Sequence, residues 1–455
     1  MTRPWSRTAA VFSFSDGASA ASWSDDLKKK IDANVDLHFQ NETQVGLVVG
    51  VIRGNEIHFW SYGEKNRGSG IKPDADTFFE IGSITKTYTA TLLALEVEKG
   101  TVSLQDPIEL FWKELQETEA GKITLQELAS HTSGLPRMPS NFVMTDPENP
   151  YKNYDAVLLT EFLKNYKAAS PGPYPHAYSN VGLGVLGYIL AEKINGLSYA
   201  DYLETNLLKP LGLRETKTRV DPAVQPNFAQ GYDTFFSLVP FWDLNVLDGA
   251  GALKASARDL LRYLEFNMNA DSSLIGRAMN LAQAQLFATA SKPRTVGLGW
   301  ESRSFGRYNV IEHAGATGGY RADLMFDKTE KLGAIVLSNT DLVPVCVLEP
   351  VFGVACEIPK FQSVSAAVAG KLVGKFESAA IGLKAEIILR NGQLGVVPEG
   401  QSQLRLFAKS QFEYAVPDAK VDVVFIPSAS AAVDQFELKQ SGQTYLFERR
   451  WPFEN

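Results

Sequence analysis

The sequence predicts an α+β fold: an antiparallel sheet flanked by helices carries a helical subdomain and is followed by a small C-terminal all-β, barrel-like domain. Strand patterns occur near both ends of the region from about 25 to 345, and helical patterns dominate from 121 to about 265. Short alternating strands follow from about 366. Strands first, helices in the middle and strands again at the end are typical of one sheet that both ends of a domain complete.

The first elements have clear local signals. Residues from about 24 to 40 show an amphipathic helical pattern, in which apolar side chains recur among charges. The stretch "VGLVVGVIRGNEIHFWSYG" predicts two strands joined at Arg53-Gly54-Asn55. The stretch "SITKTYTATLLALEVEKG" predicts a helix that ends at Gly100, a usual C-terminal stop.

Strand patterns return in the last third of the chain, at "VGLGWESRS", "YNVIEHAG", "YRADLMFD" and "LGAIVLSNT". Composition then shifts at "FQSVSAAVAG", which is typical of a linker, and Asn391-Gly392 in "AEIILRNGQLGVV" is a strong hairpin signal. We therefore divide the chain into a leader or disordered segment (1–24), a larger α+β domain (25–358), a linker (359–367) and a C-terminal β-barrel domain (368–455).

Composition excludes several classes of function. The 52 acidic and 44 basic residues are interspersed, and the net charge of −8 offers no basic stripe for nucleic acid. No apolar run reaches the roughly 18–20 residues that span a bilayer. The N-terminus has early arginines but only a short apolar stretch, so it is no convincing signal peptide, and the compartment stays open between the cytoplasm and secretion. Cys346 and Cys356 are expected to be buried thiols, without a zinc site.

Two Ser-x-x-Lys pairs occur, Ser69/Lys72 and Ser83/Lys86, and their context separates them. Ser69 lies in "RGSGIKP", where glycine and proline oppose a helical turn. Ser83 opens the predicted helix, and residues three apart share a helix face, so Lys86 can reach its hydroxyl. A lysine desolvated in a pocket has a lowered pKa and can act as a base. The alternative is a helix-terminal serine beside a solvated lysine.

A second constellation is Tyr178 and Asn180 in "YPHAYSNVGLGVLGYIL". A phenol beside a serine and a lysine can relay a proton, and an amide can orient a substrate; the alternative is that Asn180 only caps a helix. The same stretch contains a formal Gly-x-Gly-x-x-Gly, but no strand precedes it, so a dinucleotide site is rejected. The aromatic loop "GYDTFFSLVPFWDLN" is expected to pack against a neighbouring subdomain rather than to line an acyl pocket.

The third constellation is "IEHAGATGGY", in which His313 and Gly315 close a strand pattern before a glycine-rich turn. A strand with Gly315 lets a substrate backbone approach closely, and its amides can stabilise an oxyanion. The alternative is a histidine at an ordinary turn. The other four histidines have no metal-ligand spacing, and the chain has no Gly-x-Ser-x-Gly elbow, which argues against an α/β-hydrolase.

In order and spacing, these motifs resemble those of the serine β-lactamase and penicillin-binding-protein superfamily. More narrowly, the chain resembles the class C β-lactamase-like branch, which also holds DD-peptidases, D-aminopeptidases, family VIII carboxylesterases and some acyltransferases. The resemblance covers about residues 25–345 and includes "FEIGSITKTYTATLLALEVEKGTVSLQDPI", "ITLQELASHTSGLPR" and "HAGATGGYRADLMFD". The C-terminal region resembles the lipocalin-like domain that some members carry.

The resemblance implies a set of roles. Ser83 is the expected nucleophile, Lys86 the base and Tyr178 the proton relay to the leaving group. The expected substrate-binding residues are Asn180, His313, Gly315 and Ala316, with the backbone amides of Ser83 and Ala316 as the oxyanion hole. No metal or cofactor is implied, and the expected partner is a small ester, amide or β-lactam substrate.

One position departs from the pattern. Efficient β-lactamases of this branch usually have lysine where this chain has His313, and a largely neutral histidine is a weaker site for a substrate carboxylate. The expected function is therefore a serine hydrolase of esters or small amides. The alternatives are a true β-lactamase or DD-carboxypeptidase/D-aminopeptidase, an acyltransferase, and a non-catalytic penicillin-binding sensor.

Overall fold

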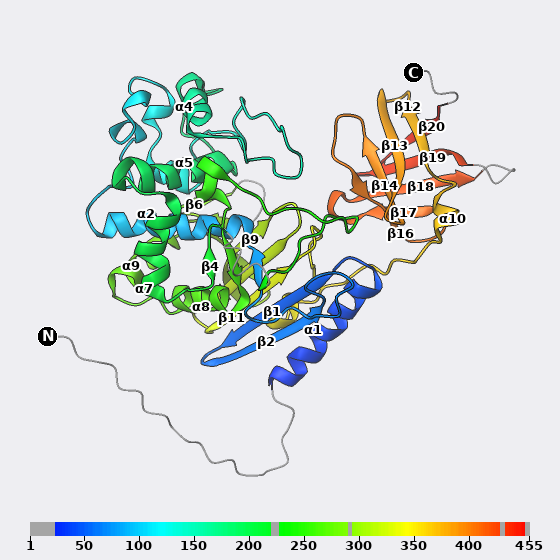
Figure 1. Cartoon of the computed structure of the whole chain (residues 1–455), viewed down its shortest axis with the longest axis horizontal. Coiled ribbons are helices and arrows are strands. Elements are labelled where there is room, and N and C mark those ends of the chain that lie inside the picture. The colour runs from blue at the N-terminus through cyan, green and yellow to red at the C-terminus, as the bar shows by residue number, and fades with distance from the viewer. Residues whose placement is uncertain (1–22, 220–226, 290–293, 428–432, 451–455) are drawn as a thin grey trace, which may run out of the picture.

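The structure is a computed structural model, and it describes residues 23–219, 227–289, 294–427 and 433–450. The larger part of the molecule contains a mixed sheet-and-helix body, and the C-terminal strands form a second body beside it (Figure 1). The predicted leader lies outside the described residues up to residue 22. No helix in the described ranges is long and apolar enough to cross a membrane.

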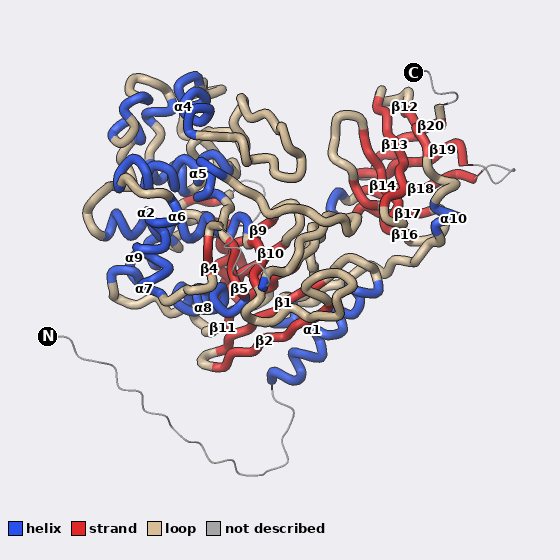
Figure 2. The backbone as a smooth tube through the Cα atoms, in the orientation of Figure 1, coloured by secondary structure: helices blue, strands red, loops and turns tan. Residues whose placement is uncertain are grey.

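The main sheet has eight antiparallel strands in the order β2-β1-β11-β10-β9-β8-β7-β6, so the strands from the two ends of the domain meet between β1 and β11. This arrangement confirms the predicted α+β class. Figure 2 shows the strands as one layer with helices beside them. The strands are β1 Gly46–Arg53, β2 Glu56–Gly63, β6 Phe287–Ala288, β7 Arg294–Val296, β8 Glu301–Phe305, β9 Tyr308–Ala316, β10 Arg321–Asp327 and β11 Leu332–Ser338.

Alternation along the strands divides the core between the two faces of the sheet. Leu47, Val49 and Val51 pack in one cluster with the apolar side chains of α1 (Trp23–Gln40). Val48 and Ile52 belong to the larger cluster, which α2 (Thr85–Glu98) and α8 (Ala257–Met268) join. Because both faces are covered, β1 is buried at every position from 46 to 52.

Helices dominate the predicted range from 121 to about 265, and one further helix, α9 (Leu274–Ala282), lies beyond it. The main helices within the range are α3 Leu125–Ala129, α4 Ala156–Asn165, α5 Asn180–Tyr188 and α6 Tyr199–Leu203. Helix α2 runs through the centre of this body, and its residues from 85 to 96 are all buried. A helix buried on every side has no polar face toward water, so its polar side chains need partners inside the protein. The hydroxyls of Thr87, Thr89 and Thr91 find them by donating to backbone carbonyls of α2 or of neighbouring segments.

A small three-stranded sheet supports the start of α2. Its order is β3-β5-β4, with β3 Phe78–Glu80, β5 Lys254–Ser256 and β4 Thr216–Lys217. Strand β3 pairs with β5 along its whole length, from Phe78↔Ser256 to Glu80↔Lys254. The chain then enters the 3-10 turn η1 (Gly82–Ile84), which leads directly into α2.

The C-terminal strands form a nine-stranded antiparallel sheet in the order β15-β14-β13-β12-β20-β19-β18-β17-β16. Its two end strands, β15 Leu404–Arg405 and β16 Phe407–Ala408, are consecutive in the chain, so the sheet curls into a nearly closed barrel, as predicted. The other strands are β12 Gly374–Ser378, β13 Leu383–Arg390, β14 Gln393–Pro398, β17 Glu413–Val416, β18 Val421–Pro427, β19 Val433–Gln440 and β20 Gln443–Arg449.

The predicted hairpin at Asn391-Gly392 is present. Both residues have positive φ, 49° and 77°, as a tight two-residue hairpin turn between β13 and β14 requires. The barrel has its own apolar core, separate from the two clusters of the main body. Phe235 and Phe236 of the aromatic loop pack against barrel residues, since the Phe235 ring lies against Gly395 and Arg405 stacks on Phe236. The expectation of subdomain packing is confirmed for these two rings.

The expectation of two buried thiols was wrong. Cys346 and Cys356 form a disulfide, with Cα atoms 5.4 Å apart. Cys346 is buried and Cys356 is exposed. The 3-10 turn at Glu349–Phe352 folds the chain back between them, which brings the two sulfur atoms together. Spacing in the sequence did not reveal this turn, so the pairing was missed.

Candidate active site

Ser83 lies in the η1 turn at the start of α2, and its hydroxyl is hydrogen-bonded to Lys86. The Nζ of Lys86 lies 2.9 Å from Ser83 Oγ and donates a second bond of 2.6 Å to the carbonyl of Ala250. The other Ser-x-x-Lys pair is different: Ser69 and Lys72 are both exposed, and Ser69 Oγ accepts from the amide of Ile71. Helical context therefore separates the two pairs as the sequence suggested.

Lys86 is fully buried, which determines its charge. Burial lowers the pKa of Lys86 well below its usual value, and the positive charge of Arg137 lowers it further. Among the described residues, no carboxylate lies within hydrogen-bond distance of the Lys86 amine. The lowered pKa favours the neutral amine, which is the form that can accept a proton as a general base does.

Tyr178 is the second polar group against the nucleophile. Burial raises the pKa of Tyr178 to about 12, although its hydrogen bond with Ser83 and the charge of Arg137 oppose the rise. The phenol is therefore protonated at neutral pH and can donate. The ring centroid lies 4.9 Å from Lys86 Nζ, so lysine, serine and tyrosine form one contiguous group.

Strand β9 passes the nucleophile turn at very short range, and two glycines allow it. A Cβ on Gly315 would lie 1.9 Å from the Ile81 carbonyl oxygen, and a Cβ on Gly82 would lie 2.7 Å from the Ala316 amide nitrogen. Neither position has space for a side chain. The contact brings the backbone of Ala316 beside that of Ser83, which is the arrangement that a pair of oxyanion-hole amides needs.

The end of β9 is open on one side. Strand β8 pairs with β9 from Phe305↔Tyr308 to Glu301↔Glu312 and then ends, whereas β10 continues to pair as far as Ala316. Residues His313–Ala316 therefore have one edge that no strand of the described sheet covers. This edge lies beside Ser83, so an extended substrate can lie along it.

His313 is buried within this segment and is neutral. Burial lowers the pKa of His313 to about 4, with Lys86 lowering it and Glu301 raising it. Its Nδ1–H donates to the Ala314 carbonyl at 2.7 Å, which fixes the neutral tautomer. His313 therefore brings no positive charge to the site near pH 7.

Asn180 is in the first turn of α5, but it does not cap that helix. The cap is Ser179, whose hydroxyl accepts from the amide of Gly182 at 3.0 Å. The Asn180 amide points toward Met138, with Nδ2 3.8 Å from the sulfur. The resemblance to the family also implies a contact between Asn180 and Lys86, but the hydrogen bonds of the Lys86 amine go to Ser83 and Ala250.

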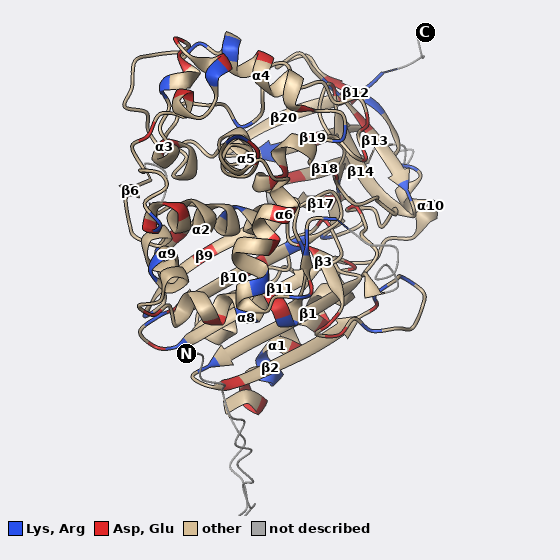
Figure 3. Ribbon diagram, turned by 60° about the vertical axis from the view of Figure 1, so that its left-hand side comes forward, with Lys and Arg blue, Asp and Glu red and all other residues tan. Residues whose placement is uncertain are grey.

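These residues line a cleft of about 440 Å³. Ser83, Tyr178, His313, Gly315 and Ala316 all belong to its walls. Acidic and basic residues are interspersed over the molecule rather than gathered by sign (Figure 3). The cleft follows this pattern, because its wall also contains Arg294, which pairs with Glu301 and, at 2.8 Å, with Glu312.

Ser83, the protonated phenol of Tyr178 and the strand that carries Gly315 line one cleft, with the buried amine of Lys86 bonded to Ser83 behind it. The beta-lactamase family model matches residues 31–347, which include all of them. The chain belongs to the beta-lactamase family. The predicted membership in the serine β-lactamase and penicillin-binding-protein superfamily is confirmed.

Known members of the family are similar over most of the larger body. The beta-lactamase of Pseudomonas fluorescens is 25% identical over 346 residues, which cover 69% of this chain and 94% of that protein. The D-alanyl-D-alanine-carboxypeptidase/endopeptidase AmpH of Escherichia coli K12 is 26% identical over 336 residues, which cover 68% of this chain and 82% of that protein. The crystal structure of a class C beta-lactamase from Rhodobacter sphaeroides superposes with a TM-score of 0.63 and 26% identity, over 71% of this chain and 97% of that one.

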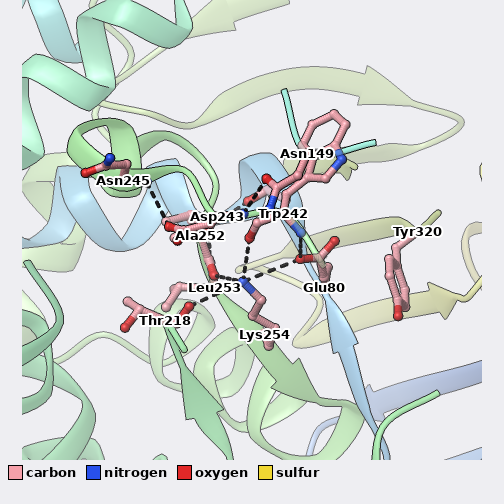
Figure 4. Close-up of polar contacts among 12 residues, drawn as sticks. Glu80, Asn149, Thr218, Trp242, Asp243, Asn245, Ala252, Leu253, Lys254 and Tyr320 are labelled. Atoms are coloured by element: carbon pink, nitrogen blue, oxygen red, sulfur yellow. Dashed lines mark hydrogen bonds and ion pairs between the residues drawn. The ribbon is translucent and has the colours of Figure 1, made fainter. Parts of the chain in front are cut away.

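In this beta-lactamase-family chain, a buried ion pair supports the nucleophile turn from behind. Lys254 Nζ lies 3.4 Å from Glu80 Oε1, and both side chains are almost fully buried. The Glu80 carboxylate also accepts from the amide of Trp242 at 2.9 Å. The lysine donates to three carbonyls, those of Thr218, Trp242 and Ala252 (Figure 4). Glu80 precedes Ser83 by three residues, so this network fixes where the turn begins.

Sequence reasoning did not single out Arg137, which is exposed at the cleft with its guanidinium 5.1 Å from the centroid of the Tyr178 ring. It also missed His131, whose ring lies 4.5 Å from that of Tyr178. The only available signal was "SHTSGLPR", one of the segments that resemble the family. Both residues come from the loop after α3, more than 40 residues before Tyr178, so spacing alone did not connect them.

We expect Arg137→Gln to shift the acid limb of the pH profile, the range in which activity rises with pH, to higher pH. If Lys86 is the base that the resemblance implies, activity rises with pH as the lysine loses its proton. Arg137 lowers the pKa of Lys86, and removing its charge therefore raises that pKa and reduces activity most at the acid end. The measurement is kcat/KM against pH for a neutral ester. The matched control is Arg307→Gln, an exposed arginine at the other end of β9. An unmoved limb in Arg137→Gln would contradict the coupling.

Proposed function

We propose that this chain is a serine hydrolase that cleaves esters or small amides through an acyl-enzyme on Ser83. The observation that carries the proposal is the 2.9 Å contact between Ser83 Oγ and the buried amine of Lys86. The amine is buried, and its two hydrogen bonds go to the Ala250 carbonyl and to Ser83 itself. The amine has a clear chemical value as a base.

In the proposed reaction, Lys86 takes the Ser83 proton as Oγ attacks the carbonyl carbon. The oxyanion accepts hydrogen bonds from the amides of Ser83 and Ala316. Tyr178 donates its proton to the leaving alkoxide or amine as the bond to the acyl carbon breaks, and it regains a proton from Lys86. Water then attacks the acyl-enzyme and gives a proton to the same base, and Lys86 returns this proton to Ser83 Oγ as the bond to the acyl carbon breaks and the acid product leaves.

The open edge of β9 supports a second candidate among the same hydrolases, a carboxypeptidase or aminopeptidase. An extended peptide can pair with residues 313–316 through main-chain hydrogen bonds, as strands add to exposed sheet edges. The name of the AmpH relative gives such a substrate for that protein. Domain limits of 25–358 for the catalytic part and 368–455 for the barrel remain part of the proposal, with 359–367 as the linker between them.

Active-site labelling tests the proposal directly. The protein is treated with a fluorophosphonate or a labelled penicillin, and the adduct is located by mass spectrometry. We expect one adduct on Ser83, none in Ser83→Ala, and an unchanged adduct in Ser69→Ala, which is the matched control from the other Ser-x-x-Lys pair. A wild-type protein without a serine adduct would refute the hydrolase. Short-chain p-nitrophenyl esters, D-amino-acid anilides and nitrocefin, assayed side by side, then identify the substrate class.

The neutral charge of His313 predicts weak turnover of β-lactams. We expect His313→Lys to lower the KM for carboxylate-bearing β-lactams such as nitrocefin, because the new ammonium can pair with the substrate carboxylate. KM for a neutral p-nitrophenyl ester serves as the comparison within the same variant. Equal kcat/KM for nitrocefin in the variant and the wild type would count against this role of the position.

A further inference from the structure

The C-terminal barrel contacts one segment of the catalytic body, residues 231–242, at several consecutive positions. Arg390 pairs with Asp233 at 2.9 Å, and Asn391 Nδ2 donates to the Phe235 carbonyl at 3.1 Å and to Ser237 Oγ at 3.0 Å. Both barrel residues come from the β13–β14 hairpin. Three residues of the segment, Asp233, Phe235 and Ser237, are therefore held by this hairpin.

Packing adds to these polar contacts. Phe235 is fully buried, and a Cβ on Gly395 of β14 would lie 2.5 Å from its ring, so the glycine provides the space that the ring occupies. Arg405 donates to the Thr234 carbonyl at 3.1 Å and stacks over Phe236 at 5.0 Å. Phe236 has a φ of 60°, which a bulky residue rarely adopts, so the barrel contacts help to hold an unfavourable backbone conformation.

The other side of the same segment packs on the turn between β9 and β10. A Cβ on Gly319 would lie 2.3 Å from Val239, and a Cβ on Gly318 would lie 2.9 Å from the indole nitrogen of Trp242. The ring of Tyr320 lies against Gly231, and its centroid is 6.0 Å from that of Phe241. Glycines at 318 and 319 are thus covered closely by residues 231–242.

This turn begins directly after Ala316, and Trp242 also belongs to the network behind Ser83. Its amide donates to Glu80 and its carbonyl accepts from Lys254, as Figure 4 shows. The segment therefore contacts both halves of the site: the strand end that carries Ala316 and the strand that leads into Ser83. Between the barrel contacts at 233–237 and Trp242 lie only four residues.

We infer that the C-terminal barrel is a positioning element of the active site, and that Arg390 and Asn391 are its positioning residues. By holding residues 233–237, the barrel fixes the segment that presses on the β9–β10 turn, and so sets the distance between the amides of Ala316 and Ser83. The inference rests on the proposed function, since it assigns these two amides to the oxyanion. Small displacements of such donors are costly: about 1 Å of misplacement can reduce rates by on the order of 10²-fold.

The test variant is Arg390→Gln with Asn391→Gly. Glycine keeps the positive φ that the hairpin turn needs but removes the amide that reaches the segment. The matched control is Ser441→Gly, at the corresponding position of the β19–β20 hairpin, where Ser441 also has positive φ. Arg390→Lys is the conservative variant, because it retains the charge opposite Asp233.

The first readout is the affinity for phenylboronic acid, which forms a bond from Ser83 Oγ to boron and gives a tetrahedral adduct without a leaving group. We expect the double variant to bind it about tenfold more weakly or worse, with kcat for an ester falling and KM little changed, because the lost interaction belongs to the tetrahedral state. The control should bind as the wild type does, and Arg390→Lys should recover most of the affinity.

The second readout is hydrogen exchange of the backbone amides from 315 to 320, which needs no turnover. We expect faster exchange in the double variant and in Asp233→Asn, which breaks the same ion pair from the catalytic side, with barrel amides unchanged. Unchanged exchange together with unchanged boronate affinity would overturn the inference. A wild type that takes neither boronate nor serine label would refute the proposed function instead, while faster exchange would still show that the barrel holds the turn.

Discussion

Replacing Lys86 with methionine is expected to lower kcat/KM for a short-chain ester by on the order of 10³-fold, while the protein stays folded. Methionine retains the apolar stem that fills the buried space around residue 86, and it removes only the amine. In the proposed mechanism, Ser83 then has no base to take its proton. Methionine leaves the buried Ala250 carbonyl without its donor, so unfolding by urea should show a loss of about 1–3 kcal/mol.

The variant should also lose the acid limb of its pH profile, since the group whose deprotonation produces that limb is gone. Lys72→Met, in the exposed Ser-x-x-Lys pair, is the matched control and should keep both the rate and the limb. Near wild-type activity in Lys86→Met would mean that another group deprotonates Ser83, and Tyr178 would be the first to test.

The second large effect concerns stability. Lys254→Met is expected to lower the free energy of unfolding by about 3–5 kcal/mol, because it leaves the Glu80 carboxylate buried without its counter-charge. Burial raises the pKa of Glu80, and the lysine opposes that rise. When a carboxyl has a higher pKa in the folded than in the unfolded state, the protein loses stability as the pH rises above the pKa of that group in the unfolded state. The deficit of the variant should therefore be larger at pH 8 than at pH 5.

The double variant Glu80→Gln with Lys254→Met is the control for this effect. Glutamine keeps an oxygen that can accept from the Trp242 amide, and the pair then has no charge left to bury. Most of the lost stability should return, and the dependence on pH should disappear. The measurement is urea unfolding of the wild type and both variants at both pH values. A single variant as stable as the wild type would show that the ion pair contributes nothing to the catalytic body.

The sequence predicted contacts between residues that are close together in the chain, and it did not predict contacts between residues that are far apart. The contact between Ser83 and Lys86 follows from helical spacing, and the turn at Asn391-Gly392 follows from residue type. The ion pair between Glu80 and Lys254 joins residues on two strands that are far apart in sequence, and neither has a local pattern that marks it. The same holds for Arg137, which only the fold brings to Tyr178.

The barrel contacts show the same limit for a whole segment. The aromatic loop gave Phe235 and Phe236 as candidates for packing, but nothing near them in sequence indicated which surface they meet. That surface includes Gly395, a strand glycine whose missing side chain makes room for the ring. Such complementarity depends on both surfaces, so it cannot be predicted from the sequence of one of the two segments.

The open edge of β9 also affects how the protein behaves in solution. A long exposed strand edge invites pairing with another copy and leads to aggregation. Here the open stretch covers only residues 313–316, and it lies within a cleft between the nucleophile turn and the charged wall. A foreign strand would have too few positions to pair with, whereas a short substrate has enough. Residues 313–316 of β9 can thus stay open for a substrate without pairing with the same edge of another copy.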